Sequence, residues 1–173
     1  RALGKPEFPS RVVCFGSRHV TPDRDVSDNT QVMAEFPSGG TLIVTSSSIH
    51  GAGFNETIRG HYGTIALSST GDILEYKPER DFSEDFDPET FTKLTPNGNA
   101  TPQHHKNWLD CIRSGEEPVA GIELAMRVQA VISLAEISER RSTMAHFDPK
   151  TRKVTDGSGK EIKSYDYAED ATL

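Results

Sequence analysis

The feature that most constrains the fold is a pair of predicted helices that follows a series of short, β-rich segments. Thr101 and Pro102 are typical of a helix start, as an N-cap and a proline at the first helical position, and Gly115 is typical of a C-terminal cap. We therefore expect a first helix over residues 102–114 and a second over 122–140, where apolar residues recur at spacings of three and four. The expected core-facing residues of the second helix are Leu124, Ala125, Val128, Val131, Ile132, Ala135 and Ile137.

Upstream of the helices, β-branched and aromatic residues predict strands joined by tight turns. Pro-Ser-Gly-Gly at 37–40 links two of these strands in an antiparallel hairpin, and a second hairpin turns at 69–72. Around the second turn the side chains alternate in polarity, which indicates a sheet covered on one face only. The predicted strands cover residues 11–20, 30–36, 41–48, 62–68 and 73–77.

The remaining segments are expected to be less regular. Residues 81–99 are rich in Asp, Glu, Pro, Thr and Asn, which predicts an irregular loop held by its phenylalanines. Short closing strands are expected over 143–147 and from 154, with a loosely held tail over 160–173. Residues 1–6 are typical of a helix end capped by glycine, so we expect further sequence before Arg1. The order of elements predicts an α+β fold, a mostly antiparallel open sheet with two main helices packed on one face.

Composition limits the kinds of partner. The 173 residues fit one domain, and 26 acidic against 19 basic residues give a net charge of -7. An acidic chain without a basic face is not expected to bind nucleic acid or an anionic membrane surface, and no apolar stretch has the length of a membrane span. The two cysteines, Cys14 and Cys111, show no disulfide or metal-ligand spacing and are predicted to be buried thiols.

Motifs for catalysis or cofactor binding are weak. Residues 51–56 (GAGFNE) follow an apolar strand as a phosphate loop does, but Glu56 replaces the third glycine and residues 57–60 are a poor helix start. We interpret this run as a loop between strands. His104 and His105 are adjacent, and neither they nor the other histidines have metal-ligand spacing, so no metal site is expected. No nucleophile motif is present, and no catalytic residue is assigned.

Several segments, taken in order, carry a family resemblance. They are 3–6 (LGKP), 35–40 (EFPSGG), 62–64 (YGT), 104–114 (HHKNWLDCIRS) and 147–149 (FDP). Together they resemble the bacterial-type C-terminal domain of the Gfo/Idh/MocA oxidoreductases, which are NAD(P)-dependent enzymes acting on sugars and cyclitols.

The resemblance implies that cofactor binding and substrate binding belong to different domains. In the family, an N-terminal Rossmann domain binds NAD or NADP and supplies a Lys-Pro catalytic motif, and a helix upstream of Arg1 completes the acid/base pair. Residues 1–173 then correspond to a single substrate-binding and oligomerisation domain, which is expected to bind no cofactor and to be inactive alone. The expected partners are a sugar or cyclitol substrate, the missing Rossmann domain, and further copies of the chain through the open sheet face.

Six residues are candidates for substrate binding. Polar and aromatic groups suit a polyhydroxylated ligand. Trp108 has a competing interpretation, in which it and Ile112 pack toward the sheet as ordinary core residues. The candidates are His50, Asn55 and Arg59 from the glycine-rich loop, and His104, His105 and Trp108 from the first helix.

Two alternatives to sugar or cyclitol oxidation remain open. A member of the same family that cleaves glycosides by transient NAD-dependent oxidation fits the same residues, and so does a non-catalytic sugar-binding or scaffold module. The residues do not decide between NAD and NADP, and they leave the substrate, the compartment and the number of subunits open.

Overall fold

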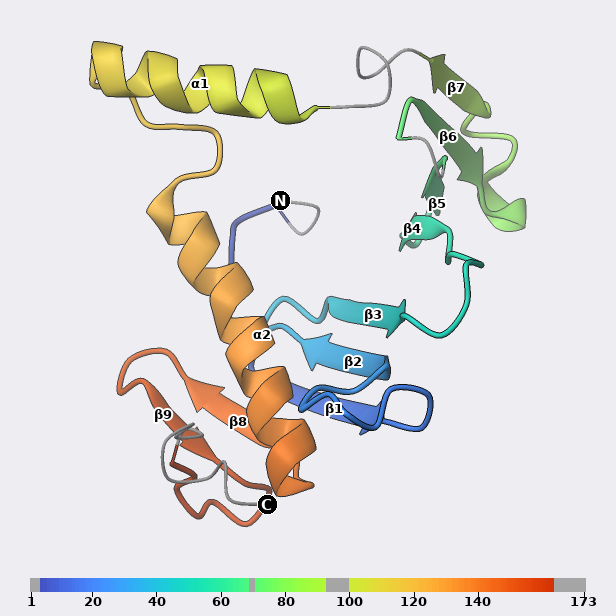
Figure 1. Ribbon diagram of the computed structural model, residues 1–173. Coiled ribbons are helices and arrows are strands. Elements are labelled where there is room, and N and C mark those ends of the chain that lie inside the picture. The colour runs from blue at the N-terminus through green and yellow to red at the C-terminus, as the bar shows by residue number, and fades with distance from the viewer. Residues whose placement is uncertain (1–3, 69–70, 93–99, 164–173) are drawn as a thin grey trace. The chain divides into compact units, whose positions relative to one another are not determined.

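The computed structural model describes residues 4–68, 71–92 and 100–163, which belong to two compact units (Figure 1). The first unit combines the N-terminal residues up to 51 with those from 120 onward, and the second comprises the residues between. The first unit is therefore closed by segments from both ends of the chain.

The first unit is built on an antiparallel sheet of five strands in the order β3-β2-β1-β8-β9. At the turn between β2 and β3, the Phe36 N–H donates to the Gly40 carbonyl over 2.9 Å, and Gly39 has a φ of 86°, a conformation that favours glycine. The predicted hairpin is confirmed. The strands are β1 (Arg11–Ser17), β2 (Asn29–Glu35), β3 (Thr41–Ser47), β8 (Ala145–Asp148) and β9 (Lys153–Thr155).

Helix α2 (Ile122–Arg141) covers one face of this sheet, lying on β1 and β8. Ser138 is buried between them, and its Oγ accepts the Cys14 N–H at 2.9 Å and donates to the Thr143 carbonyl at 2.6 Å. This hydroxyl ties the helix to the central strand. The core consists of Val12, Cys14, Ala34, Leu134, Ala135, Ile137 and Ala145.

The buried face of α2 differs from the predicted one. Leu134 is only 2% exposed, whereas Ile132 is 55% exposed and Val128 is also exposed. Helix α2 is apolar on two sides, and on each side the apolar residues recur every three or four positions. This spacing therefore does not determine which side packs on the sheet. Ala135 and Ile137 are buried as predicted.

The second unit contains a four-stranded antiparallel sheet in the order β4-β5-β6-β7. Its register places one set of apolar side chains on the same face, namely Ile58, Ile65, Leu67, Leu74, Tyr76 and Phe91. The opposite face carries Thr57, Glu75 and Thr90, so the predicted alternation over 73–77 is confirmed. The strands are β4 (Glu56–Arg59), β5 (Gly63–Leu67), β6 (Ile73–Pro78) and β7 (Glu89–Thr92).

An aromatic cluster holds the segment after β6 against the turn before β5. Tyr62 lies edge-on to Phe82 with ring centroids 4.9 Å apart, and Phe86 lies 5.8 Å from Tyr62. A Cβ on Gly63 would come within 2.5 Å of the Tyr76 ring, so glycine is needed there. The prediction that phenylalanines hold this segment is confirmed for Phe82 and Phe86.

The α+β class and the antiparallel open-sheet character are confirmed. Three details differ from the prediction: the described strands form two sheets, the predicted loop contains the short strand β7, and β4 follows the glycine-rich loop. Residues 1–3, 69–70, 93–99 and 164–173, which include parts of the expected helix end, second hairpin turn, loop and tail, lie outside the described residues.

Candidate functional site

Helix α1 (Thr101–Ser114) carries three of the six candidate residues, and its ends are set by local chemistry. Gly115 caps the C-terminus in the left-handed conformation, with a φ of 77°, and its N–H donates to the Cys111 carbonyl at 2.9 Å. The predicted N-cap is wrong by one residue. Ala100 occupies the cap without a side-chain hydrogen bond, and Thr101 is the first helical residue, because Pro102 is tolerated anywhere in the first turn.

One face of α1 is formed by His104, His105, Trp108, Leu109 and Ile112, and we call it the Trp108 face. Residues in an α-helix are about 100° apart around the axis, so these five lie within roughly 140° of one another. Trp108 is 56% exposed and Ile112 is 63% exposed, and no residue of α1 is buried. The packing of Trp108 and Ile112 toward the sheet stays a prediction.

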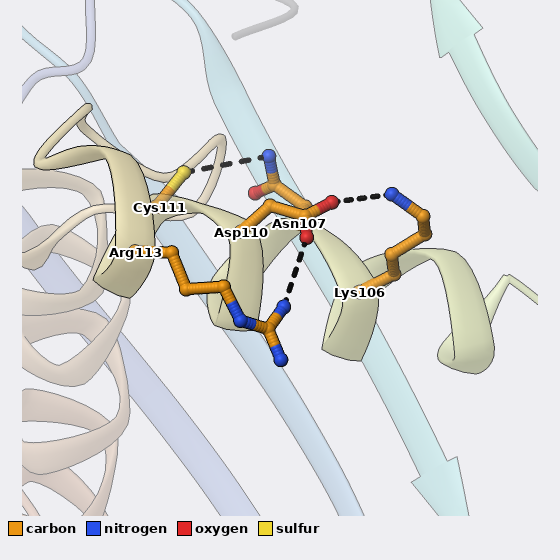
Figure 2. A network of polar contacts seen from close by, with 5 residues as sticks. All are labelled: Lys106, Asn107, Asp110, Cys111 and Arg113. Atoms are coloured by element: carbon orange, nitrogen blue, oxygen red, sulfur yellow. Dashed lines mark hydrogen bonds and ion pairs between the residues drawn. The ribbon is translucent and has the colours of Figure 1, made fainter.

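The opposite side of α1 carries a network of charges (Figure 2). Asp110 is ion-paired with Lys106, and the Arg113 Nη1 lies 3.2 Å from its Oδ1. The hydrogen bond from Lys106, together with the positive charges of Lys106 and Arg113, lowers the pKa of Asp110 from its usual value. Charges that are paired and exposed to water in this way mark the solvent side of the helix.

Asn107 connects α1 to the segment that follows it. Its amide donates to the Cys111 Sγ at 3.7 Å (Figure 2), and its Oδ1 accepts the Val119 N–H at 3.0 Å. The chain after Gly115 is thereby folded back along the helix. Cys111 is half-buried, so the prediction of a buried thiol is wrong for this residue.

The glycine-rich loop places the other three candidates. His50 follows β3 in the first unit, whereas Asn55 precedes β4 and Arg59 ends it in the second, and all three are exposed. The loop runs into strand β4 and not into a helix, which confirms the interpretation of 51–56 as a loop between strands. Without a helix N-terminus, this loop lacks the amide donors that bind a pyrophosphate.

Two half-buried polar side chains, those of Ser27 and Glu139, lie near the buried Cys14 in the first unit. Glu139 hydrogen-bonds Ser27 and lies 3.8 Å from the Cys14 Sγ. Burial, and secondarily the charge of Glu139, raises the pKa of the Cys14 thiol to about 11. This thiol is protonated at neutral pH, so its environment favours a structural role over a nucleophilic one.

The described residues contain neither a metal site nor a membrane-spanning helix. Within 4–68, 71–92 and 100–163, no group of three or more His, Cys, Asp or Glu side chains is arranged to hold a metal ion. In the same part of the chain, neither helix combines the length and apolarity needed to cross a membrane.

The polar network of α1 was not predicted from the sequence. Lys106 and Asp110, like Asn107 and Cys111, are four residues apart, which is the spacing at which helical side chains meet. This spacing is the sequence feature from which the two contacts could have been predicted. The contact between Asn107 and Val119 has no such signal, because it depends on how the chain turns after the helix.

No protein-family model matches the sequence, and no curated protein matches it. Solved structures do. The chain is similar to aldose-aldose oxidoreductase from Caulobacter crescentus complexed with glycerol, with a TM-score of 0.64, 18% identity, and coverage of 82% of this chain and 42% of that one.

Two further structures show the same pattern. An oxidoreductase from Agrobacterium radiobacter in complex with NAD+, L-tartaric acid and magnesium has a TM-score of 0.60 and 18% identity, covering 80% of this chain and 43% of that one. UDP-N-acetylglucosamine 3-dehydrogenase from Acidithiobacillus ferrooxidans has a TM-score of 0.56 and 14% identity, and the match covers 77% of this chain and 43% of that one. The likeness establishes a shared fold. This chain spans less than half the length of the structures that it matches.

Proposed function

We propose that this chain is the substrate-side and oligomerisation portion of an NAD(P)-dependent oxidoreductase that acts on a sugar or cyclitol hydroxyl. The observation that carries the proposal is that the fold matches about 80% of this chain to oxidoreductases while covering only 42–43% of theirs. The order of the segments that resemble the Gfo/Idh/MocA family supports membership of that family.

The substrate is proposed to meet the N-terminal half of α1. The imidazoles of His104 and His105 have ring centroids 6.5 Å apart and offer hydrogen-bonding groups to hydroxyls, and the exposed ring of Trp108 on the same face offers a surface for the apolar face of a sugar. His50, Asn55 and Arg59 are proposed as further polar contacts. Their role in this chain is to bind and orient the substrate.

The dinucleotide is proposed to bind outside this chain. NAD or NADP, when bound, accepts or donates a hydride at the reacting carbon. The described residues do not fit the cofactor, because Glu56 adds negative charge where a pyrophosphate would lie and a strand follows in place of a helix. The nucleotide site is therefore assigned to a Rossmann domain upstream, and residues 1–173 alone are expected to be inactive.

Oligomerisation is proposed to use the sheet face that α2 leaves open. Val13, Met33 and Ile43 lie in one row across β1, β2 and β3, and Phe15 extends this row along β1. Phe15 is 69% exposed and Ile43 is 65% exposed. An apolar centre of this kind with a polar rim is typical of a subunit interface.

The rim is polar at both ends of the open face. The ion pair of Arg11 with Glu35 flanks the apolar row at one end, and Asn29 and Gln31, hydrogen-bonded to each other at 3.0 Å, flank it at the other. Because a two-fold interface brings the same patch of each copy together, such a face can pair with itself.

The proposed activity is tested with the protein expressed from its complete reading frame. A panel of aldoses and cyclitols is offered with NAD and with NADP, and formation of reduced nicotinamide is followed. At least one substrate is expected to give turnover, and Trp108→Ala is expected to raise its KM roughly 3- to 10-fold through lost stacking. Lys106→Ala, on the opposite side of α1, is the matched control and is expected to leave KM unchanged. Absence of turnover across the panel would count against the proposal.

The same protein separates oxidation from glycoside cleavage. Incubation with NAD and aryl glycosides, followed by product analysis, gives free aglycone without net NAD reduction if the protein is a redox glycosidase. Reduced nicotinamide accumulating with an intact glycosidic bond is the result expected for the dehydrogenase proposed here.

A further inference from the structure

We propose that Asp28 is a positioning residue for the substrate contact assigned to His50. This inference rests on the proposed function and deepens it, because it adds a buried carboxylate that acts on that contact through the backbone. Both residues belong to the first unit, and every contact that links them lies within it.

The Asp28 carboxylate is buried and holds the loop that follows β1. Asp28 is 4% exposed. Its Oδ2 accepts three consecutive backbone N–H groups, those of His19 at 3.0 Å, Val20 at 2.7 Å and Thr21 at 3.1 Å. Successive amides that converge in this way form a site for an anion, and here the anion is the chain's own side chain. The bonds from Thr21 and Val20 lower the pKa of Asp28, so the group is ionised at neutral pH.

The backbone of Asp28 holds the segment that leaves β3. Beyond the last residue pair of β2 and β3, the Asp28 carbonyl accepts two hydrogen bonds from Ser48, from the N–H at 2.9 Å and from the Oγ at 3.3 Å. The Ile49 N–H then donates to the Ser47 Oγ at 3.4 Å. His50 is the next residue. The chain therefore enters His50 in a direction that Asp28 helps to set.

Asp28 thereby joins two loops at one end of the five-stranded sheet. Its side chain binds the loop after β1, its N–H donates to the Ser17 carbonyl at 3.0 Å, and its carbonyl binds Ser48. A neutral side chain at this position would bind the three amides more weakly, because hydrogen bonds to an ionised acceptor are the stronger kind. The backbone of residue 28 could then shift and move the segment that carries His50.

A double-mutant cycle tests the positioning role in the protein expressed from the complete reading frame. Asp28→Asn keeps the size of the side chain and removes its charge. Asp25→Asn, at an exposed position of the same loop, is the matched control. With the sugar or cyclitol that gives the best turnover, Asp28→Asn is expected to raise KM about 3- to 10-fold and to change kcat by less than about twofold. Asp25→Asn is expected to leave both constants unchanged.

The second arm of the cycle is His50→Ala, which is also expected to raise KM. Adding Asp28→Asn to His50→Ala is expected to change KM by less than about twofold further, because the side chain that Asp28 positions is already absent. A role in stability alone would lower the free energy of unfolding and leave the KM of the folded molecules unchanged.

The NMR signal of the His50 imidazole gives a second measurement that needs no turnover. In protein labelled with isotope-enriched histidine, the signal that is lost in His50→Ala belongs to His50. Asp28→Asn is expected to shift this signal, and Asp25→Asn is not. If Asp28→Asn does not fold, Ser48→Ala takes its place in both measurements, because it removes one bond to the Asp28 carbonyl and leaves the carboxylate intact.

Three results would overturn the positioning proposal. They are an unchanged KM in Asp28→Asn, effects of Asp28→Asn and His50→Ala that multiply in the double variant, and a His50 signal that does not move. Absence of turnover across the whole panel refutes the proposed function instead, and the His50 signal then still decides whether Asp28 holds His50 in place.

Discussion

Replacing Ser138 with alanine is expected to destabilise the first unit strongly. Ser138 is 1% exposed, and its Oγ bonds both the Cys14 N–H and the Thr143 carbonyl. Alanine leaves one backbone donor, the Cys14 N–H, and one backbone acceptor, the Thr143 carbonyl, without their partner, at about 1–3 kcal/mol for each group. Allowing for some relaxation of the carbonyl toward water, we expect a loss of about 2–4 kcal/mol in the free energy of unfolding.

Urea denaturation followed by circular dichroism measures this loss. With a slope of about 2 kcal/mol per molar urea, in the middle of the usual range, the midpoint is expected to fall by about 1–2 M while the slope stays constant. Ser133→Ala is the matched control on the same helix, where the side chain is exposed and accepts only a 3.3 Å hydrogen bond from Gln129. Its effect is expected to stay within about 0.5 kcal/mol.

Equal urea midpoints for Ser138→Ala and Ser133→Ala would contradict this prediction. That result would mean that the contact of α2 with β1 does not depend on the Ser138 hydroxyl, and that apolar packing alone holds the helix on the sheet.

Four further predictions follow from other parts of the structure. Gly16→Ala is expected to lower the free energy of unfolding by about 1–2 kcal/mol, because the new Cβ would lie 2.0 Å from the Glu139 carboxylate and displace it from Ser27. Thermal unfolding measures this loss, and Gly157→Ala is the control, because nothing lies within 4 Å of a Cβ at that position. The pKa of Asp28 is lowered because its carboxylate accepts hydrogen bonds from the Thr21 and Val20 N–H groups. The carboxylate therefore stabilises the fold above its unfolded-state pKa, and this stabilisation is lost as the pH falls through its folded-state pKa. The difference in free energy of unfolding between wild type and Asp28→Asn is expected to narrow below about pH 4, and a difference that stays constant with pH would contradict this. A thiol assay on the native chain at pH 8 is expected to count Cys111 but not Cys14, and to count both after denaturation; two fast thiols in the native chain would disprove the burial of Cys14. Ile43→Asp is expected to dissociate the proposed oligomer in sedimentation velocity while Ser38→Asp, in the β2–β3 turn, does not; equal masses for the two variants would remove the open face as the interface.

Local signals predicted the elements that they encode directly. The glycines of the 37–40 turn and Gly115 each fix a backbone conformation, so the β2–β3 hairpin and the end of α1 could be placed from the sequence. Strands β4 and β7 were missed because each has only four residues in a polar context, and their pairing with β5 and β6 is a long-range property.

The candidate site was predictable only in part. Helical spacing alone groups His104, Trp108 and Ile112 on one face of α1. Whether that face is covered, and by what, depends on contacts between distant segments, so spacing alone does not decide the predicted packing of Trp108 against the sheet. For α2 the same limit applies, because Ile132 and Leu134 fit the apolar pattern equally well and only Leu134 is buried.

Titration of NAD(H) with nicotinamide fluorescence tests the central proposal most directly. We expect saturable binding to the protein expressed from the complete reading frame. We expect no binding to residues 1–173, because the loop at 51–56 leads into strand β4 and not into a phosphate-binding helix. Saturable binding to residues 1–173 would contradict the assignment of the nucleotide site to an upstream domain. No binding of either dinucleotide to the longer protein would contradict the proposal that it is an NAD(P)-dependent oxidoreductase.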